Sequence, residues 1–151
     1  MTSWSGPGQG SSGTSADAVR AAARRLARLL DEDDFPAARA LLADECVYAT
    51  ARETLRGPDA ILESYRAASA WARRTFDEVR YESEVESVSG GTARVTFVDY
   101  LLKVGHGWHR YRCQQEFTVR ADGRVAQIVH RELSGEREAL EAFFAACGVE
   151  R

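Results

Sequence analysis

His130 and Glu132 stand two positions apart in the last long β-type run of the chain. Residues two apart share one face of a β-strand, so an imidazole and a carboxylate would lie side by side there. Histidine has a reference pKa of about 6.5, which suits proton transfer at neutral pH, and a neighbouring carboxylate fixes the imidazole tautomer. The pair therefore predicts an acid/base site. Two structural alternatives stay open: a merely hydrogen-bonded pair, or pairing of Glu132 with Arg110 or Arg112 across strands.

The cysteines and the other histidines offer weaker chemistry. Cys113 can act as a nucleophile only if its pKa is depressed, and a small buried strand residue is the expected alternative. His106 and His109 are close in sequence, but no third ligand accompanies them. The three cysteines, which also include Cys46 and Cys147, form no CxxC pair. We therefore expect no disulfide framework, no metal and no cofactor.

Hydrophobic periodicity predicts the elements that must position these residues. Helices are expected over residues 16–31, 34–42 and 58–74, with a last one capped by Ser134 and closed by Gly148. Strands are expected over 46–50, 79–88, 93–104, 108–120 and 125–133. This order predicts one α+β domain over residues 16–151. The Gly/Ser-rich residues 1–15 are expected to be a disordered tail.

Alternation along the strands predicts which side chains face the interior. On the strand 108–120 these are Tyr111, Cys113, Gln115 and Phe117. Two assignments stay open. On the strand 93–104 either Asp99 or Tyr100 faces inward, and on the last strand the apolar face with Val129 competes with the His130 face, because a one-residue slip inverts the assignment.

Three phrases in a fixed order resemble the NTF2-like superfamily and its SnoaL-like branch. They are LLDEDDFPAARALLADECVYAT, LRGPDAILESYRAA and QQEFTVRADGRVAQIVHREL, and the match covers about residues 17–134. The resemblance implies a cone-shaped fold, in which a strongly bent antiparallel sheet wraps around the N-terminal helices and a C-terminal helix follows. It also implies an internal pocket for a hydrophobic small molecule. Such folds host many activities, so function has to be argued from the site.

The resemblance also places candidate site residues. The carboxylate base of ketosteroid isomerases falls at Thr50, which cannot accept a carbon-bound proton at neutral pH, so that activity is not expected. The acid/base Asp of SnoaL-like polyketide cyclases falls at His130. The catalytic candidates are therefore His130, Glu132 and Asp99. The candidate substrate-binding residues are Tyr48, Thr50, Tyr65, Tyr111, Gln115, Phe117 and Ile128.

Two classes of function stay open for such a small-molecule-pocket protein. One is a cofactor-free acid/base enzyme (isomerase, cyclase, dehydratase or hydrolase) acting on a hydrophobic metabolite. The other is a non-catalytic ligand-binding module or a dimeric partner-binding module. The outward row of Arg110, Arg112 and Arg120 lies on a face that commonly forms dimers in this fold, so a homodimer is expected.

Charge and hydropathy exclude some partners. The formal net charge is −3, which disfavours nucleic acid as a partner. No run of about 18 apolar residues occurs, so no membrane span is expected. The first residues lack the basic and apolar regions of a secretory signal, which predicts a cytoplasmic protein.

Overall fold

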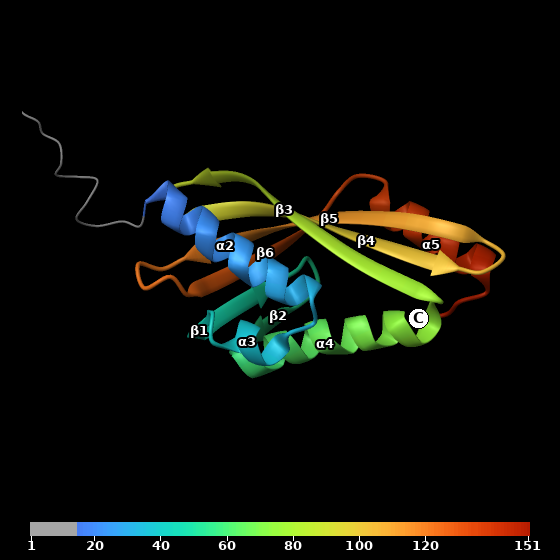
Figure 1. Ribbon diagram of the computed structural model, residues 1–151, viewed down its shortest axis with the longest axis horizontal. Helices are drawn as coiled ribbons and strands as arrows, with labels where there is room; N and C mark the ends of the chain where they lie inside the picture. The colour runs from blue at the N-terminus through green and yellow to red at the C-terminus, as the bar shows by residue number, and fades with distance from the viewer. Residues whose placement is uncertain (1–14) are drawn as a thin grey trace, which may run out of the picture.

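The computed structural model describes residues 15–151 (Figure 1). The expected disordered tail, residues 1–15, lies outside this range apart from Ser15. Ser15 caps helix α2 (Ala16–Asp31), because its hydroxyl accepts a hydrogen bond from the Ala18 N–H at 3.1 Å. Serine is a favoured residue at this position, since it satisfies a backbone donor that the helix leaves free.

The elements after α2 follow the expected α+β order with one addition. They are α3 (Phe35–Arg39), β1 (Leu42–Ala49), β2 (Thr54–Arg56), α4 (Pro58–Thr75), β3 (Glu78–Ser89), β4 (Thr92–Lys103), β5 (Gly107–Val119), β6 (Val125–Glu132) and α5 (Glu136–Cys147). The addition is β2, a three-residue strand that pairs with β1. Three residues carry too little alternation to predict a strand.

Helix α3 is shorter than the sequence predicted. The expected range 34–42 is wrong at its end, because α3 stops at Arg39 and Leu42 already belongs to β1. Leu42 lies opposite Val125 of β6 and is 2% exposed. Pairing with a neighbouring strand and burial therefore prevail over the local preference for helix.

The six strands form one curved sheet in the order β2-β1-β6-β5-β4-β3, which confirms the α+β fold. The sheet is mixed rather than wholly antiparallel, because β1 and β6 run parallel. Helices α2, α3 and α4 cover one face of the sheet, called here the inner face (Figure 1). The opposite face is called the outer face. No helix within residues 15–151 is long and apolar enough to cross a membrane.

A bulge at the start of β6 resolves the competition between its two faces. Val125 pairs with Val119, but Gln127 pairs with Thr118, so one extra residue lies between them. Val125 and Ile128 are consequently both fully buried, although in a regular strand residues three positions apart face opposite sides. The face that carries Ile128 also carries His130.

Two apolar clusters fill the space under the inner face. The first joins α2, α3, the start of α4 and the sheet, and it includes Leu26, Ile61 and Phe117. The second joins the end of α4, the far end of the sheet and α5, and it includes Phe76 and Phe144. Of the candidate site residues, Phe117 and Ile128 belong to the first cluster and Tyr111 to the second, and Gln115 and His130 lie on the sheet between them.

Candidate functional site

Strand register sets the candidate residues side by side on the inner face. Gln115 of β5 lies opposite His130 of β6, and Cys113 lies opposite Glu132. Two residues before Cys113 in β5, Tyr111 lies opposite Asp99 of β4. The side chains expected to face inward from β5 are buried, as alternation predicted: Tyr111, Cys113, Gln115 and Phe117.

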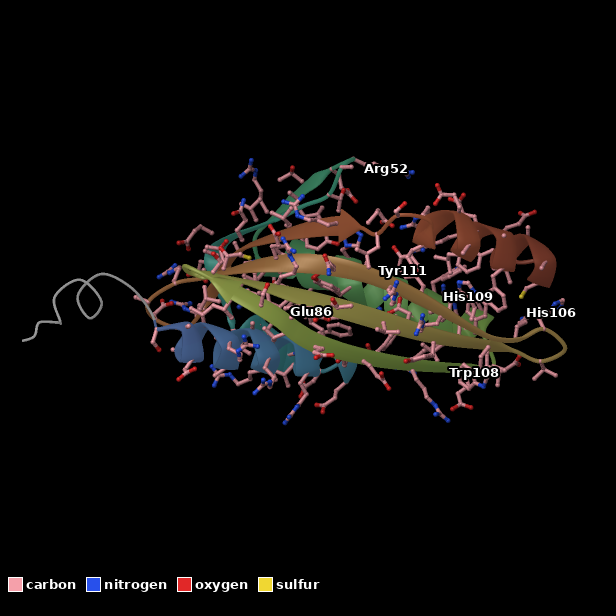
Figure 2. The ribbon with its side chains drawn as sticks, turned by 90° about the horizontal axis from the view of Figure 1, so that it is seen from above. Arg52, Glu86, His106, Trp108, His109 and Tyr111 are labelled. Carbon is pink, nitrogen blue, oxygen red and sulfur yellow. The ribbon has the colours of Figure 1, made fainter. Side chains whose placement is uncertain are left out.

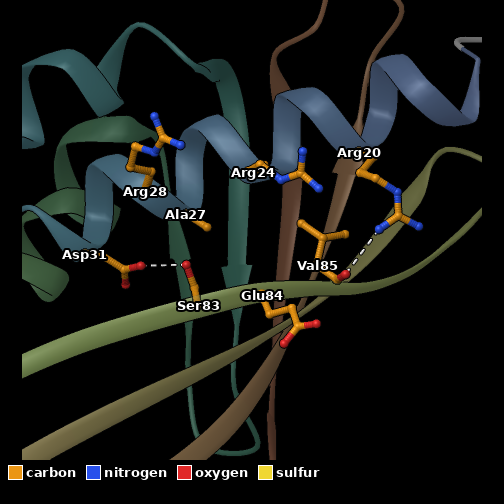
Figure 3. A pocket seen from close by; sticks show the side chains of 8 residues that line it. All are labelled: Arg20, Arg24, Ala27, Arg28, Asp31, Ser83, Glu84 and Val85. Carbon is orange, nitrogen blue, oxygen red and sulfur yellow. Dashed lines mark hydrogen bonds between the residues drawn. The ribbon is translucent and has the colours of Figure 1, made fainter.

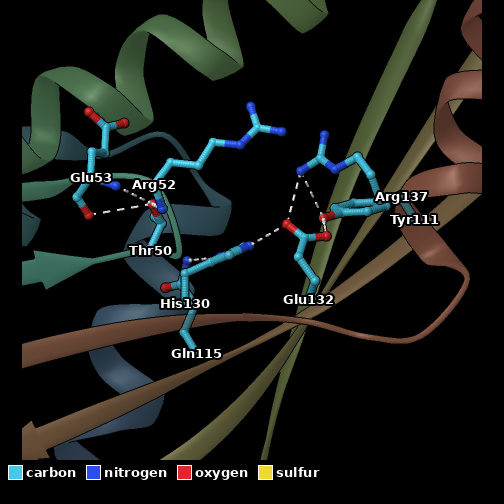
Figure 4. A network of polar contacts seen from close by, with 8 residues as sticks. All are labelled: Thr50, Arg52, Glu53, Tyr111, Gln115, His130, Glu132 and Arg137. Carbon is cyan, nitrogen blue, oxygen red and sulfur yellow. Dashed lines mark hydrogen bonds and ion pairs between the residues drawn. The ribbon is translucent and has the colours of Figure 1, made fainter.

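A chain of hydrogen bonds runs across these strands (Figure 4). The Tyr65 hydroxyl donates to Gln115 Oε1 at 2.7 Å, so the amide nitrogen of Gln115 faces His130 Nδ1 at 3.3 Å. His130 Nε2 lies 2.9 Å from Glu132 Oε2. Since the amide nitrogen of Gln115 can only donate, we assign Nδ1 of His130 as the acceptor and Nε2 as the nitrogen that donates to Glu132.

Glu132 ends this chain and accepts from three side chains. Besides His130, the Tyr111 hydroxyl donates to it at 2.8 Å and Arg137 of α5 at 2.9 Å. Burial opposes the charge of this carboxylate. The hydrogen bonds from Arg137, His130 and Tyr111 outweigh burial and lower the pKa of Glu132 to about 2.

We call Tyr65, Gln115, His130, Glu132, Tyr111 and Arg137 the Glu132 network. Sequence reasoning missed Arg137, which lies at the start of α5 and also contacts the Tyr111 ring face at 5.5 Å. Its only sequence signal is a basic residue five positions after Glu132. The alternative pairing of Glu132 with Arg110 or Arg112 is not observed, since Arg112 bonds to Glu136.

Asp99 faces inward, and Tyr100 faces outward, where its hydroxyl donates to Glu82. Asp99 lies between Tyr81 and Tyr111 on the neighbouring strands. Burial first, and then the nearby charge of Asp31, raise its pKa to about 7. No described residue donates a hydrogen bond to it, and it is not part of the Glu132 network.

The other candidate residues divide into walls, core and turn. The rings of Tyr48 and Tyr65 meet edge to face at 5.6 Å, and no described residue bonds to the Tyr48 hydroxyl. Phe117 and Ile128 are fully buried in the first cluster. Thr50 holds the β1–β2 turn, where its hydroxyl accepts from two backbone N–H groups at 3.1 Å.

Cys113 and the two remaining histidines take no part in the network. Burial raises the pKa of the Cys113 thiol, which keeps it protonated. His106 lies in the β4–β5 turn, and the ring of His109 stacks on Phe143 at 4.8 Å (Figure 2). Within residues 15–151 no group of three potential metal ligands comes together.

One residue of the network, Arg137, lines a groove beside α5. This groove of about 270 Å³ is lined by Arg137 and by Glu141, Phe144 and Arg151 among others. The side chains of Arg137 and Glu132 are each 40% exposed, whereas that of His130 is 15% exposed. The exposed end of the network is therefore the pair of Arg137 and Glu132, and a molecule in this groove contacts Arg137.

Comparison with known proteins identifies the family and the fold of the chain. The profile of the SnoaL-like domain matches residues 23–128. No curated protein matches the sequence.

Solved structures give the same picture of the fold. A de novo designed protein with a curved β-sheet is 15% identical with a TM-score of 0.63, and the match covers 88% of this chain and 99% of the other. An LEH-like epoxide hydrolase from M. tuberculosis is 19% identical with a TM-score of 0.61, over 87% and 95% of the two chains. An NTF2-like protein of unknown function from Exiguobacterium is 16% identical with a TM-score of 0.58, over 75% and 98%.

Proposed function

The chain belongs to the SnoaL-like domain family, and from this premise we propose that it binds a small, largely apolar molecule carrying one uncharged oxygen group. The oxygen group is held at the exposed end of the Glu132 network. The apolar part packs against the aromatic and aliphatic side chains around it. Such a combination of apolar walls with a few convergent polar groups is typical of small-molecule sites.

The observation that carries this proposal is that the members of the Glu132 network form hydrogen bonds and an ion pair with one another. Glu132 and Arg137 balance each other's charge, so the site favours an uncharged group over an ion. Arg137 is accessible and has further N–H donors, and the Tyr48 hydroxyl has no partner among residues 15–151. A ligand carbonyl, hydroxyl or ether oxygen satisfies either donor.

The Glu132 network is better suited to binding a ligand than to transferring a proton. Both ring nitrogens of His130 are engaged, and a carboxylate with a pKa of about 2 is a weak base at neutral pH. A second candidate function, acid/base catalysis, rests on Asp99. Its pKa of about 7 and its free oxygens suit a general acid or base on the same face.

Chemical-shift mapping tests the binding proposal. Three uncharged aromatic probes, 2-naphthol, 1-indanone and styrene oxide, are titrated into the whole chain at neutral pH. We expect saturable shifts at the amides of Gln115 and Glu132 for at least one probe. Glu132→Gln, which leaves Arg137 unbalanced, weakens that binding by about tenfold, whereas the exposed control Glu138→Gln does not. Absence of saturation with all three probes, or equal affinity in Glu132→Gln, contradicts the proposal.

Styrene oxide also tests the catalytic alternative, since one structural neighbour bears the name of an epoxide hydrolase. Formation of the diol by the wild-type chain, lost in Asp99→Asn but retained in the exposed control Asp44→Asn, favours acid/base catalysis. Binding without diol formation favours a binding protein.

We also propose a homodimer formed through the outer face of the sheet. Partly exposed apolar side chains, Val98, Tyr100 and Leu102, lie along the middle of this face. Acidic Glu82 lies on one side of them, and basic Arg110 on the other. A two-fold axis through this strip would place the acidic side of one copy against the basic side of the other.

A further inference from the structure

We propose that a second site, in the groove between α2 and β3, binds an organic phosphate whose phosphoryl group is held by Arg24 and Arg28. The groove has a volume of about 410 Å³ (Figure 3). It lies beside the first apolar cluster, with which it shares Ala27 and Val85, and it shares no residue with the Glu132 network. The proposal is therefore independent of the function proposed above.

The spacing of the arginines is the first argument. Arg20, Arg24 and Arg28 follow each other at intervals of four residues, so they lie in a row along α2 and line the groove. Like charges at this spacing destabilise a helix. Arg25 adds a fourth positive charge, and no acidic residue lies between Asp17 and Asp31 to offset them. A bound anion would supply the missing compensation.

The second argument is that two of these guanidinium groups are uncommitted. Arg20 donates to the backbone oxygen of Val85 at 3.1 Å, which ties it to β3. Arg24 and Arg28 have no hydrogen bond or ion pair with any residue of the described part of the chain. Guanidinium groups bind phosphate oxygens through paired N–H donors, which a phosphoryl group matches with three oxygens.

The two acidic side chains of the groove do not cancel this charge. Asp31 is turned to the Ser83 hydroxyl, and burial, outweighing that hydrogen bond, raises its pKa to about 6. Glu84 lies across the groove on β3, so three arginines face two carboxylates, Asp31 and Glu84. The remaining excess of positive charge favours an anionic ligand over an uncharged one.

The remaining lining determines the class of phosphate. Ala27 and Val85, which are 2% and 8% exposed, form the narrow apolar floor of the groove beside the arginines. A free phosphate ion leaves this part empty, whereas the organic part of an ester covers it. The groove therefore favours an ester with a small apolar body over inorganic phosphate.

Isothermal titration of the full chain with phenyl phosphate tests the proposal, with inorganic phosphate as a second arm at the same ionic strength. We expect phenyl phosphate to bind saturably and more tightly than inorganic phosphate. The double variant Arg24→Gln/Arg28→Gln loses about tenfold or more in affinity, because it removes both uncommitted donors. The matched control Arg25→Gln, on the same helix but outside the groove, retains the affinity.

The melting temperature and a second control variant distinguish loss of this site from unfolding and from binding at the Glu132 network. Glutamine has a helix propensity close to that of arginine, and the double variant removes like-charge repulsion, so its melting temperature is unchanged or raised. Arg137→Gln, which removes the exposed cation of the Glu132 network, leaves phenyl phosphate binding intact, because Arg137 lies outside the groove. No saturation with phenyl phosphate, tighter binding of inorganic phosphate, or equal losses in Arg25→Gln and the double variant would overturn the proposal.

Discussion

Glu132 and Asp99 lie on the same face of the sheet, yet their pKa values move in opposite directions. Glu132 accepts hydrogen bonds from three side chains and its pKa falls to about 2. Asp99 has no such partner, and burial raises its pKa to about 7. Hydrogen bonds stabilise the charged form of a carboxyl group and desolvation destabilises it. The different surroundings of Glu132 and Asp99 therefore give two side chains of the same chemical type opposite pKa shifts. Glu132 is suited to anchoring and Asp99 to proton exchange.

We expect Asp99→Asn to stabilise the chain at pH 8 and to have little effect at pH 4. The unfolded carboxyl has a pKa of 3.8 and the folded one of about 7, so the folded state holds the extra proton between these values. The contribution of Asp99 to the free energy of unfolding is fully present below pH 3.8, and it is lost as the pH rises through about 7. The gain at pH 8 is about 1–3 kcal/mol in the free energy of unfolding, measured by urea denaturation.

The exposed Asp44→Asn serves as the control, and we expect it to change the free energy of unfolding by no more than about 0.5 kcal/mol at either pH. If Asp99→Asn changes stability equally at pH 4 and pH 8, the carboxyl is charged across that range and its burial does not govern its titration.

Helix α5 connects the site to the second apolar cluster. Its first turn carries Arg137, and its other side buries Leu140 and Phe144. The Phe144 ring meets Trp71 at 5.5 Å and Phe76 at 5.8 Å, both from the end of α4. The position of Arg137 beside Glu132 thus depends on aromatic packing about two turns further along the helix.

Phe144→Ala should cost about 3 kcal/mol in the free energy of unfolding, because it opens a cavity between α4, α5 and the sheet. Urea denaturation measures the loss. The exposed Glu138→Ala on the same helix should change stability by no more than about 0.5 kcal/mol. A cost as small as that of the control would mean that α5 is held to the sheet by its polar contacts instead.

At the scale of the whole molecule, the two faces of the sheet differ in what covers them. Helices cover the inner face, whereas the outer face carries partly exposed apolar side chains between acidic and basic ones. Trp108 on this face is 46% exposed. Burying this strip against a second copy lowers the apolar area exposed to water.

Light scattering after gel filtration should give a mass about twice the 16.7 kDa of one chain. Arg110→Glu places a like charge against the acidic side of the partner, so we expect the mass of a single chain at micromolar concentration. Arg52→Glu, on the β1–β2 turn away from this face, should remain dimeric (Figure 2). A wild-type chain that elutes as a monomer excludes the interface.

Local patterns predicted much of the fold. Period-two alternation on β5 identified the buried Tyr111, Cys113, Gln115 and Phe117, because the direction of a strand side chain depends only on its place in the strand. The N-cap Asp34 and the left-handed Gly148 after α5 also follow from local backbone chemistry.

Other features depend on which distant segments meet, and only the tertiary structure decided them. The inward direction of Asp99, the parallel pairing of β1 with β6 and the contact of Arg137 with Glu132 are of this kind. The bulge at the start of β6 is another, since it brings Val125 and His130 to one face against simple alternation. Each of these features results from strand register and packing between segments far apart in the chain. The spacing of residues within one segment does not reveal which distant segment it will pair with.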